Sequence, residues 1–208
     1  MDVAAIAALA PVIPVLTIER VADAVPLARA LVKGGLPVLE ITLRTPVALE
    51  ALQAIAREVP EAVLGAGTIL APDQFGRVRD AGARFAVSPG CTAALVEAAE
   101  AARLSFLPGI QTVSEAMVLA ERGFTLMKFF PADAAGGIAW LKSVAAPLAG
   151  LRFCPTGGIG AETAQAYLSL ANVACIGGSW VAPREAVAVG DWGRIERLAA
   201  AASKLKRP

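Results

Sequence analysis

The 208-residue sequence contains no histidine and little charge. The missing histidine excludes Ser-His-Asp and Cys-His nucleophiles, acid–base catalysis by imidazole, and the usual zinc sites. Charged residues make up 18% of the chain and the formal net charge is +1, so we expect no nucleic-acid partner and no membrane surface. Any catalysis must therefore rest on Lys, Glu, Asp, Arg, Tyr or backbone amides.

Cysteines and long apolar runs are also scarce. Cys91, Cys154 and Cys175 are scattered without CxxC spacing, which is typical of small buried residues in a reduced cytoplasmic protein. The longest uncharged run, 163–183, contains polar residues and a Gly-Gly pair, so it does not read as a transmembrane helix. The apolar start, residues 3–10, has no basic residue before Arg20 and so lacks the positive region of a signal peptide. We therefore expect a cytoplasmic location.

Apolar residues are abundant, at 56% of the chain, which suits a parallel sheet buried on both faces. Strand-like apolar runs recur roughly every 20 to 25 residues, and each is followed by a helix-like stretch. The eight runs are Val12–Leu16, Pro37–Leu43, Ala62–Gly67, Arg84–Ser88, Ser105–Pro108, Leu126–Phe130, Leu151–Pro155 and Val173–Ile176.

Helix-period stripes and boundary signals occupy the intervals between these runs. The stripes consist of Val21, Ala24, Val25, Ala28, Leu31 and Val32, and of Leu49, Leu52, Ile55 and Val59. Thr45 before Pro46 predicts a helix start, and Thr112 with Glu115 predicts a capping box. Predicted helix ends carry glycine at Gly34-Gly35, Gly82 and Gly123. Eight β/α units without a linker predict an α/β protein, a single (β/α)8 TIM-barrel domain over 1–208, with a doubly wound open sheet as the alternative.

Lys128 is the one cation in the apolar run 126–131. A solvated lysine is almost fully protonated at neutral pH and is a poor nucleophile. Burial among Met and Phe penalises the ammonium form and favours an amine that can attack a carbonyl to form a Schiff base. The alternative is a lysine whose head group reaches solvent at the strand end, which is at least as common for a single residue.

Glu40 is a lone carboxylate in the second strand-like run. Because side chains alternate along a strand, Glu40, Thr42 and Arg44 share a direction, which we take as inward. A buried carboxylate needs a partner, and Arg44 or Lys128 would supply one. Glu40 is then either a general base beside a lysine nucleophile, with Arg44 binding a substrate carboxylate, or one half of a structural ion pair.

Polar groups and glycines gather at the carboxyl ends of the predicted strands, where this fold places its functional groups. These residues are Thr17, Glu40, Arg44, Thr68, Pro89, Gly109, Lys128, Thr156, Gly157, Gly158, Gly177, Gly178 and Ser179. The Gly-Gly pairs follow the seventh and eighth runs, the recurrent phosphate site of the barrel, and predict a phosphorylated substrate. Thr68 and Thr156 as helix caps, and the glycines as ordinary turns, are the alternatives.

Six segments together resemble the 2-keto-3-deoxy-6-phosphogluconate (KDPG) aldolase family, which includes 4-hydroxy-2-oxoglutarate aldolase activity. The resemblance runs in order from about Pro11 to Asp191. The segments are 38–45 (VLEITLRT), 65–68 (GAGT), 85–90 (FAVSPG), 128–132 (KFFPA), 152–159 (RFCPTGGI) and 175–180 (CIGGSW).

The resemblance implies a class I aldolase, a carbon–carbon lyase that needs no metal or cofactor, cleaving KDPG to pyruvate and glyceraldehyde 3-phosphate. It implies Lys128 as the Schiff-base residue and Glu40 as the proton acceptor and donor. It also implies a homotrimer. By the same resemblance, the substrate-binding residues are Arg44 and Thr68 for the pyruvyl carboxylate, Thr156 for a hydroxyl, Gly157, Gly158, Gly178 and Ser179 for the phosphate, and Pro89 and Phe130 for the pocket wall.

Three alternatives to this activity remain at the level of sequence. Within the family, the substrate is 4-hydroxy-2-oxoglutarate or the phosphogalactonate epimer. From another class, a phosphosugar isomerase on the same barrel would use Glu40 as base and Lys128 as an electrophile. A noncatalytic binding module for a sugar acid phosphate is least favoured, because a buried lysine and glutamate cost stability without benefit to binding alone.

Overall fold

The computed structural model describes residues 2–208, in which strands and helices alternate through most of the chain. The strands are β1 Val12–Leu16, β2 Val38–Thr42, β3 Val63–Gly67, β4 Phe85–Val87, β5 Ser105–Leu107, β6 Gly109–Ile110, β7 Leu126–Phe129, β8 Arg152–Pro155 and β9 Ile176–Gly178. The helices are α1 Val3–Ala8, α2 Val21–Lys33, α3 Ala48–Glu58, α4 Asp73–Asp80, α5 Ala93–Ala102, α6 Val113–Glu121, α7 Gly137–Val144, α8 Ala161–Leu168, α9 Arg184–Ala188 and α10 Trp192–Ala202.

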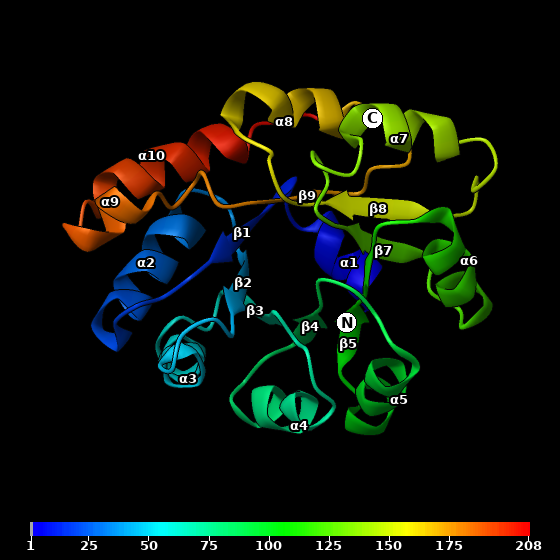
Figure 1. The fold of residues 1–208 in the computed structure, drawn as a ribbon. Helices are drawn as coiled ribbons and strands as arrows, with labels where there is room; N and C mark the ends of the chain where they lie inside the picture. The colour runs from blue at the N-terminus through cyan, green and yellow to red at the C-terminus, as the bar shows by residue number, and fades with distance from the viewer. Residues whose placement is uncertain (1) are drawn as a thin grey trace.

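All the paired strands are parallel. A six-stranded sheet has the order β5-β4-β3-β2-β1-β9 and a three-stranded sheet has the order β6-β7-β8. The sheet curls into a half-barrel, with α2 to α5 outside the six-stranded part and α6 to α8 around the three-stranded part (Figure 1). The predicted α/β class with a parallel sheet is confirmed.

The hydrogen-bonded ladders do not run continuously around the sheet, so the predicted closed barrel is not confirmed. Pro108 separates β5 from β6 within one extended segment, and proline has no N–H to donate to a ladder. Near β8 and β9 the pairing is limited to two isolated bridges outside the strands' full ladders, Phe153 with Val173 and Thr156 with Gly177.

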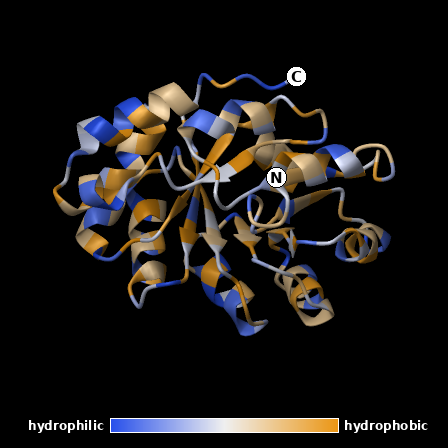
Figure 2. Ribbon diagram, turned by 45° about the horizontal axis from the view of Figure 1, so that its top comes forward, coloured by the Kyte–Doolittle hydropathy of each residue, from blue (hydrophilic) through white to orange (hydrophobic). Residues whose placement is uncertain are grey.

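The core lies on both faces of the sheet, as expected for parallel strands. Every residue of β2, β4 and β7 is buried, and the predicted stripe on α2 buries Ala24, Val25, Ala28 and Leu31. The strands are largely hydrophobic, whereas the surrounding helices alternate between hydrophobic and hydrophilic residues (Figure 2). None of the helices within residues 2–208 combines the length and apolarity that a membrane crossing requires.

Several predicted helix boundaries are confirmed and one is wrong. Thr112 and Glu115 form the capping box of α6, and Gly35, Gly82 and Gly123 follow helices with positive φ. The predicted start at Thr45-Pro46 is wrong, because α3 begins two residues later without a side-chain cap. The Thr45 hydroxyl instead donates to the Ile18 carbonyl at 2.7 Å, tying the loop after β2 to the loop after β1.

The last strand lies later than predicted. We expected Val173–Ile176, whereas β9 is Ile176–Gly178, which pairs with Val12, Ile13 and Pro14 of β1. Gly177 and Gly178 were expected in a loop, and Gly109 at a strand end lies within β6. Thr156 packs directly over Gly177 and the Trp180 ring over Gly178, so neither position has room for a Cβ. Close packing therefore requires glycine at these strand positions, and the strand propensities of single residues do not predict that requirement.

The amino end of the sheet is covered by α1, which the sequence did not predict as a helix. Ile6 and Ala7 of α1 are buried against Ile13, Phe85 and other side chains of the strands. The Arg207 guanidinium donates to the carbonyls of Ala7 and Ala8 at 2.9 Å and to the carbonyl of Ala174 at 3.2 Å. The last residues thus hold the first helix to the segment before β9.

We predict that Arg207→Ala lowers the free energy of unfolding by about 1.5–3 kcal/mol, because a charged donor to several carbonyls is lost. Urea unfolding followed by circular dichroism measures the change. Lys206→Ala removes a neighbouring exposed side chain and serves as the control, with a change within about 0.5 kcal/mol. Equal effects of the two substitutions would contradict a specific role for Arg207.

Candidate active site

An ion pair between Lys128 and Glu40 lies inside the curled sheet. Lys128 Nζ is 3.2 Å from Glu40 Oε1, and both side chains are 4% exposed. Lys128 lies on β7 and Glu40 on β2, so the pair connects the two sheets across their interior. The Lys128 amine also lies 5.3 Å from the centre of the Phe130 ring. The prediction of a buried lysine is therefore confirmed, and its head group does not reach solvent.

A small neighbour on the adjacent strand makes room for the Glu40 side chain. In the strand registers Glu40 is opposite Gly65, and Lys128 is opposite Gly109 and Cys154. At Gly67 an added Cβ would collide with the Glu40 carboxylate. Gly67 of β3 therefore leaves space that the Glu40 carboxylate occupies.

Of the two partners predicted for Glu40, the structure shows Lys128. The alternation of strand side chains does not extend to Arg44, because β2 ends at Thr42 and Arg44 lies exposed in the turn that follows. Arg44 Nε donates to the Thr68 hydroxyl at 3.1 Å. Thr68 has a φ of 62° directly after β3, and a left-handed threonine is uncommon. Arg44 and Thr68 thus meet at the mouth of the sheet instead of in its core.

A cavity of about 820 Å³ opens at the carboxyl ends of the strands. Seven of the predicted site residues line it: Arg44, Phe130, Thr156, Gly157, Gly158, Gly178 and Ser179. Lys128 is buried behind this wall, next to Phe130. Pro89 is half-buried after β4, where its backbone packs against Gly109.

The threonine and glycines at the β8 end form a compact turn. Thr156 is buried and its hydroxyl donates to the Cys154 carbonyl at 3.4 Å. Gly157 and Gly158 have φ values of 99° and 79°, a conformation that favours glycine. Neither Thr156 nor Thr68 caps a helix, because α8 begins after Gly160 and α4 after Pro72.

The cavity also has charged residues that sequence reasoning did not assign to the site: Glu19, Arg20, Asp23 and Arg184. Arg20 binds Asp23 through Nε at 2.8 Å and Nη2 at 2.9 Å. The hydrogen bond that Arg20 donates to Asp23, and then the charge of that carboxylate, raise the pKa of Arg20. The sequence carried a signal for these residues, because Glu19, Arg20 and Asp23 lie shortly after the first strand and Arg184 lies shortly after the last one. Among residues 2–208, no group of three or more His, Cys, Asp or Glu side chains is placed to hold a metal ion.

A buried lysine paired with a carboxylate, beside a cavity at the carboxyl edge of a parallel sheet, is the arrangement of a Schiff-base enzyme. The pattern of the aldolase family described as KDPG and KHG aldolase matches residues 3–198. The chain belongs to this family.

Characterised relatives match nearly the whole chain. The KHG/KDPG aldolase of Escherichia coli K12 is 51% identical over 189 residues, covering 91% of this chain and 89% of its own length. The 2-dehydro-3-deoxy-phosphogluconate aldolase of Zymomonas mobilis is 48% identical over 99% of this chain and 97% of its own. The KDPG aldolase of Legionella pneumophila, in which pyruvate was captured at low pH as a covalent carbinolamine intermediate, is 46% identical. Its structure superimposes with a TM-score of 0.96 over 98% of this chain and 99% of its own.

We predict that removing one member of the Lys128–Glu40 pair destabilises the protein more than removing both. Glu40→Leu leaves a buried lysine without a partner and lowers the free energy of unfolding by about 3–5 kcal/mol. The double variant Glu40→Leu/Lys128→Met removes both charges and recovers most of this loss. Urea unfolding of the two single variants and the double variant measures the coupling.

The exposed pair between Lys33 and Glu196, at 3.0 Å, provides the matched control for this cycle. The same substitutions there change stability by less than about 1 kcal/mol. A double variant at Lys128 and Glu40 as unstable as the worse single variant would show that the ion pair itself supports the fold.

Proposed function

We propose that this protein is a class I aldolase that cleaves KDPG to pyruvate and glyceraldehyde 3-phosphate through a Schiff base on Lys128. The observation that carries the proposal is the Lys128–Glu40 pair, buried behind the wall of the cavity. The named activities of the relatives support the same substrate. The iminium supplies the positive charge that a metal would otherwise provide.

Glu40 Oε1 lies 3.2 Å from Lys128 Nζ, close enough to accept a proton from the amine and to return it. When Glu40 accepts the ammonium proton, the free amine adds to the C2 ketone to give a carbinolamine. Glu40 then returns its proton to the carbinolamine hydroxyl, which leaves as water and gives an iminium, so that Glu40 is again a carboxylate. Glu40 then accepts the C4 hydroxyl proton, directly or through a water. The C3–C4 bond breaks, its electrons pass into the enamine, and the aldehyde leaves. Protonation of C3 and hydrolysis of the imine release pyruvate and return the lysine.

The other site residues are proposed binding groups. Arg44 and Thr68, which already contact each other, hold the pyruvyl carboxylate, where a guanidinium gives two parallel hydrogen bonds. Thr156 contacts a substrate hydroxyl, and Pro89 and Phe130 form the pocket wall. Gly157, Gly158, Gly178 and Ser179 line one side of the cavity, and their backbone N–H groups bind the phosphate.

We further propose that the two sheets together form one closed (β/α)8 barrel, in a single domain over 1–208. The two isolated bridges between residues 153–156 and 173–177, and the continuation of β5 into β6, support this closure. A homotrimer is proposed on the family resemblance.

A cytoplasmic location is proposed because Cys91, Cys154 and Cys175 are all free thiols and the substrate is a phosphorylated metabolite.

Cleavage of 4-hydroxy-2-oxoglutarate to pyruvate and glyoxylate is the second candidate activity, because the Escherichia coli relative is named for both substrates. Both reactions release pyruvate from the same imine. The phosphogalactonate epimer differs from KDPG at C4, where Thr156 is proposed to contact the hydroxyl.

We predict that incubation with pyruvate followed by borohydride reduction adds a pyruvate-derived mass to Lys128. Reduction fixes the imine as a stable secondary amine, and peptide mapping by mass spectrometry locates it. Lys128→Arg gives no adduct and no cleavage. This variant also tests the isomerase alternative, because an electrophilic cation survives the substitution whereas an imine does not.

An adduct absent from folded wild-type protein in excess pyruvate would contradict the aldolase proposal. Retained turnover of phosphosugars by Lys128→Arg would support the isomerase. Saturable binding without turnover would support a binding module.

We predict that kcat/KM falls by about tenfold or more when the same keto acid lacks its phosphate, because charge-assisted contacts to the glycine side of the cavity are lost. Steady-state cleavage, coupled to pyruvate detection, measures both substrates. Equal kcat/KM values would contradict the assignment of Gly157, Gly158, Gly178 and Ser179 to the phosphate.

A further inference from the structure

Two arginines of the cavity wall lie outside the proposed chemistry, and they differ in how they are held. Arg20 is bound to Asp23 by two short hydrogen bonds, and the Asp23 side chain is only 10% exposed. Such a bidentate pair is occupied and fixed in orientation. The Arg20 guanidinium is therefore not free to bind a ligand.

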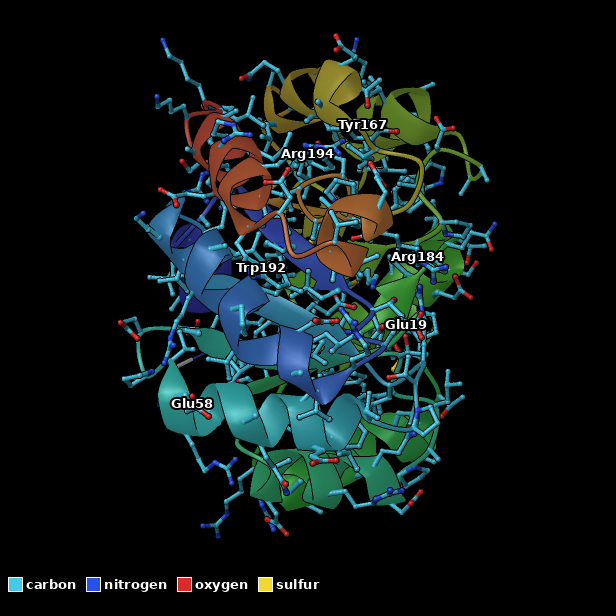
Figure 3. All side chains as sticks on the ribbon, turned by 90° about the vertical axis from the view of Figure 1, so that its left-hand side faces the viewer. Glu19, Glu58, Tyr167, Arg184, Trp192 and Arg194 are labelled. Carbon is cyan, nitrogen blue, oxygen red and sulfur yellow. The ribbon has the colours of Figure 1, made fainter. Side chains whose placement is uncertain are left out.

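Arg184 is held much more loosely. Its Nη2 lies 3.7 Å from Glu19 Oε1, and the side chains of Arg184 and Glu19 are 82% and 65% exposed. Ion pairs this exposed contribute little to stability. Figure 3 shows the two residues near each other at one edge of the molecule, Glu19 ahead of α2 and Arg184 at the start of α9. A ligand can therefore replace Glu19 as the partner of Arg184 at small cost.

The location of Arg184 connects it to the glycine side of the cavity. It follows β9 by a short loop, and Gly178 and Ser179 at the end of that strand line the same cavity. Arg44, the proposed carboxylate ligand, lines the cavity from the turn after β2. A substrate with its carboxylate at Arg44 and a phosphate at its far end carries a dianion toward the start of α9, where Arg184 lies.

We propose that Arg184 is a specificity-determining residue whose guanidinium leaves Glu19 and binds the distal phosphate of the substrate. This assignment rests on the proposed function and adds a side-chain contact to the backbone groups already assigned. Arginine suits the role because its planar fork binds phosphate through two hydrogen bonds. Glu19 acts as an internal competitor, so that a dianionic phosphate displaces it more readily than a weaker anion or a hydroxyl.

The test compares KDPG with the same keto acid without phosphate, by steady-state cleavage. In Arg184→Gln the ratio of the two kcat/KM values falls about tenfold, mainly through KM for KDPG. Arg184→Lys keeps the positive charge but loses the planar guanidinium, so its ratio lies between those of the wild type and Arg184→Gln. In Glu19→Gln the ratio rises about two- to fivefold, because the competing carboxylate is gone.

Arg194→Gln is the matched control, because Arg194 is another exposed arginine, 3.0 Å from Glu185, and does not line the cavity. We expect the ratio of its kcat/KM values for KDPG and for the phosphate-free keto acid to equal that of the wild type. A ratio in Arg184→Gln equal to that of Arg194→Gln, or a fall in Glu19→Gln, would overturn the assignment. Pyruvate trapping on the wild type tests the proposed function separately, so the two failures are distinguishable.

Discussion

The buried ion pair between Lys128 and Glu40 constrains the interior of this protein. Two charges removed from water must be paired closely, and here they bring β2 and β7 together across the curled sheet. A neighbouring position follows from that requirement, because Gly67 provides the space that the Glu40 carboxylate fills. Replacing the pair with apolar residues would satisfy packing, so its retention points to chemistry more than to stability.

Much of this arrangement could be predicted from the sequence, because it depends on local signals. The apolar runs around Lys128 and Glu40 predicted that both are buried, with Lys128 as one of two possible partners for Glu40, and the structure places the two 3.2 Å apart. Buried parallel strands read as continuous apolar runs, and the capping box at Thr112 depends only on residues one turn apart.

The remaining features depend on contacts between distant segments. β9 is positioned by pairing with β1, so its glycines, which normally indicate a turn, lie in a strand. Thr45 has the composition of a cap, but its hydroxyl binds a carbonyl of the preceding loop. The ion pair of Glu19 with Arg184 joins residues that lie far apart in the chain, and no local pattern indicates it.

The pairing of β1 with β9 has a consequence for synthesis on the ribosome. The residues of β1 emerge early, and β2 can join them after a short interval, but the other edge of β1 has no neighbour until residues 176–178 appear. An unpaired edge of an apolar strand is a template for pairing with other chains. Nascent chains of this protein therefore carry an unpaired edge of β1 through most of their elongation, and only the last quarter of the chain covers it.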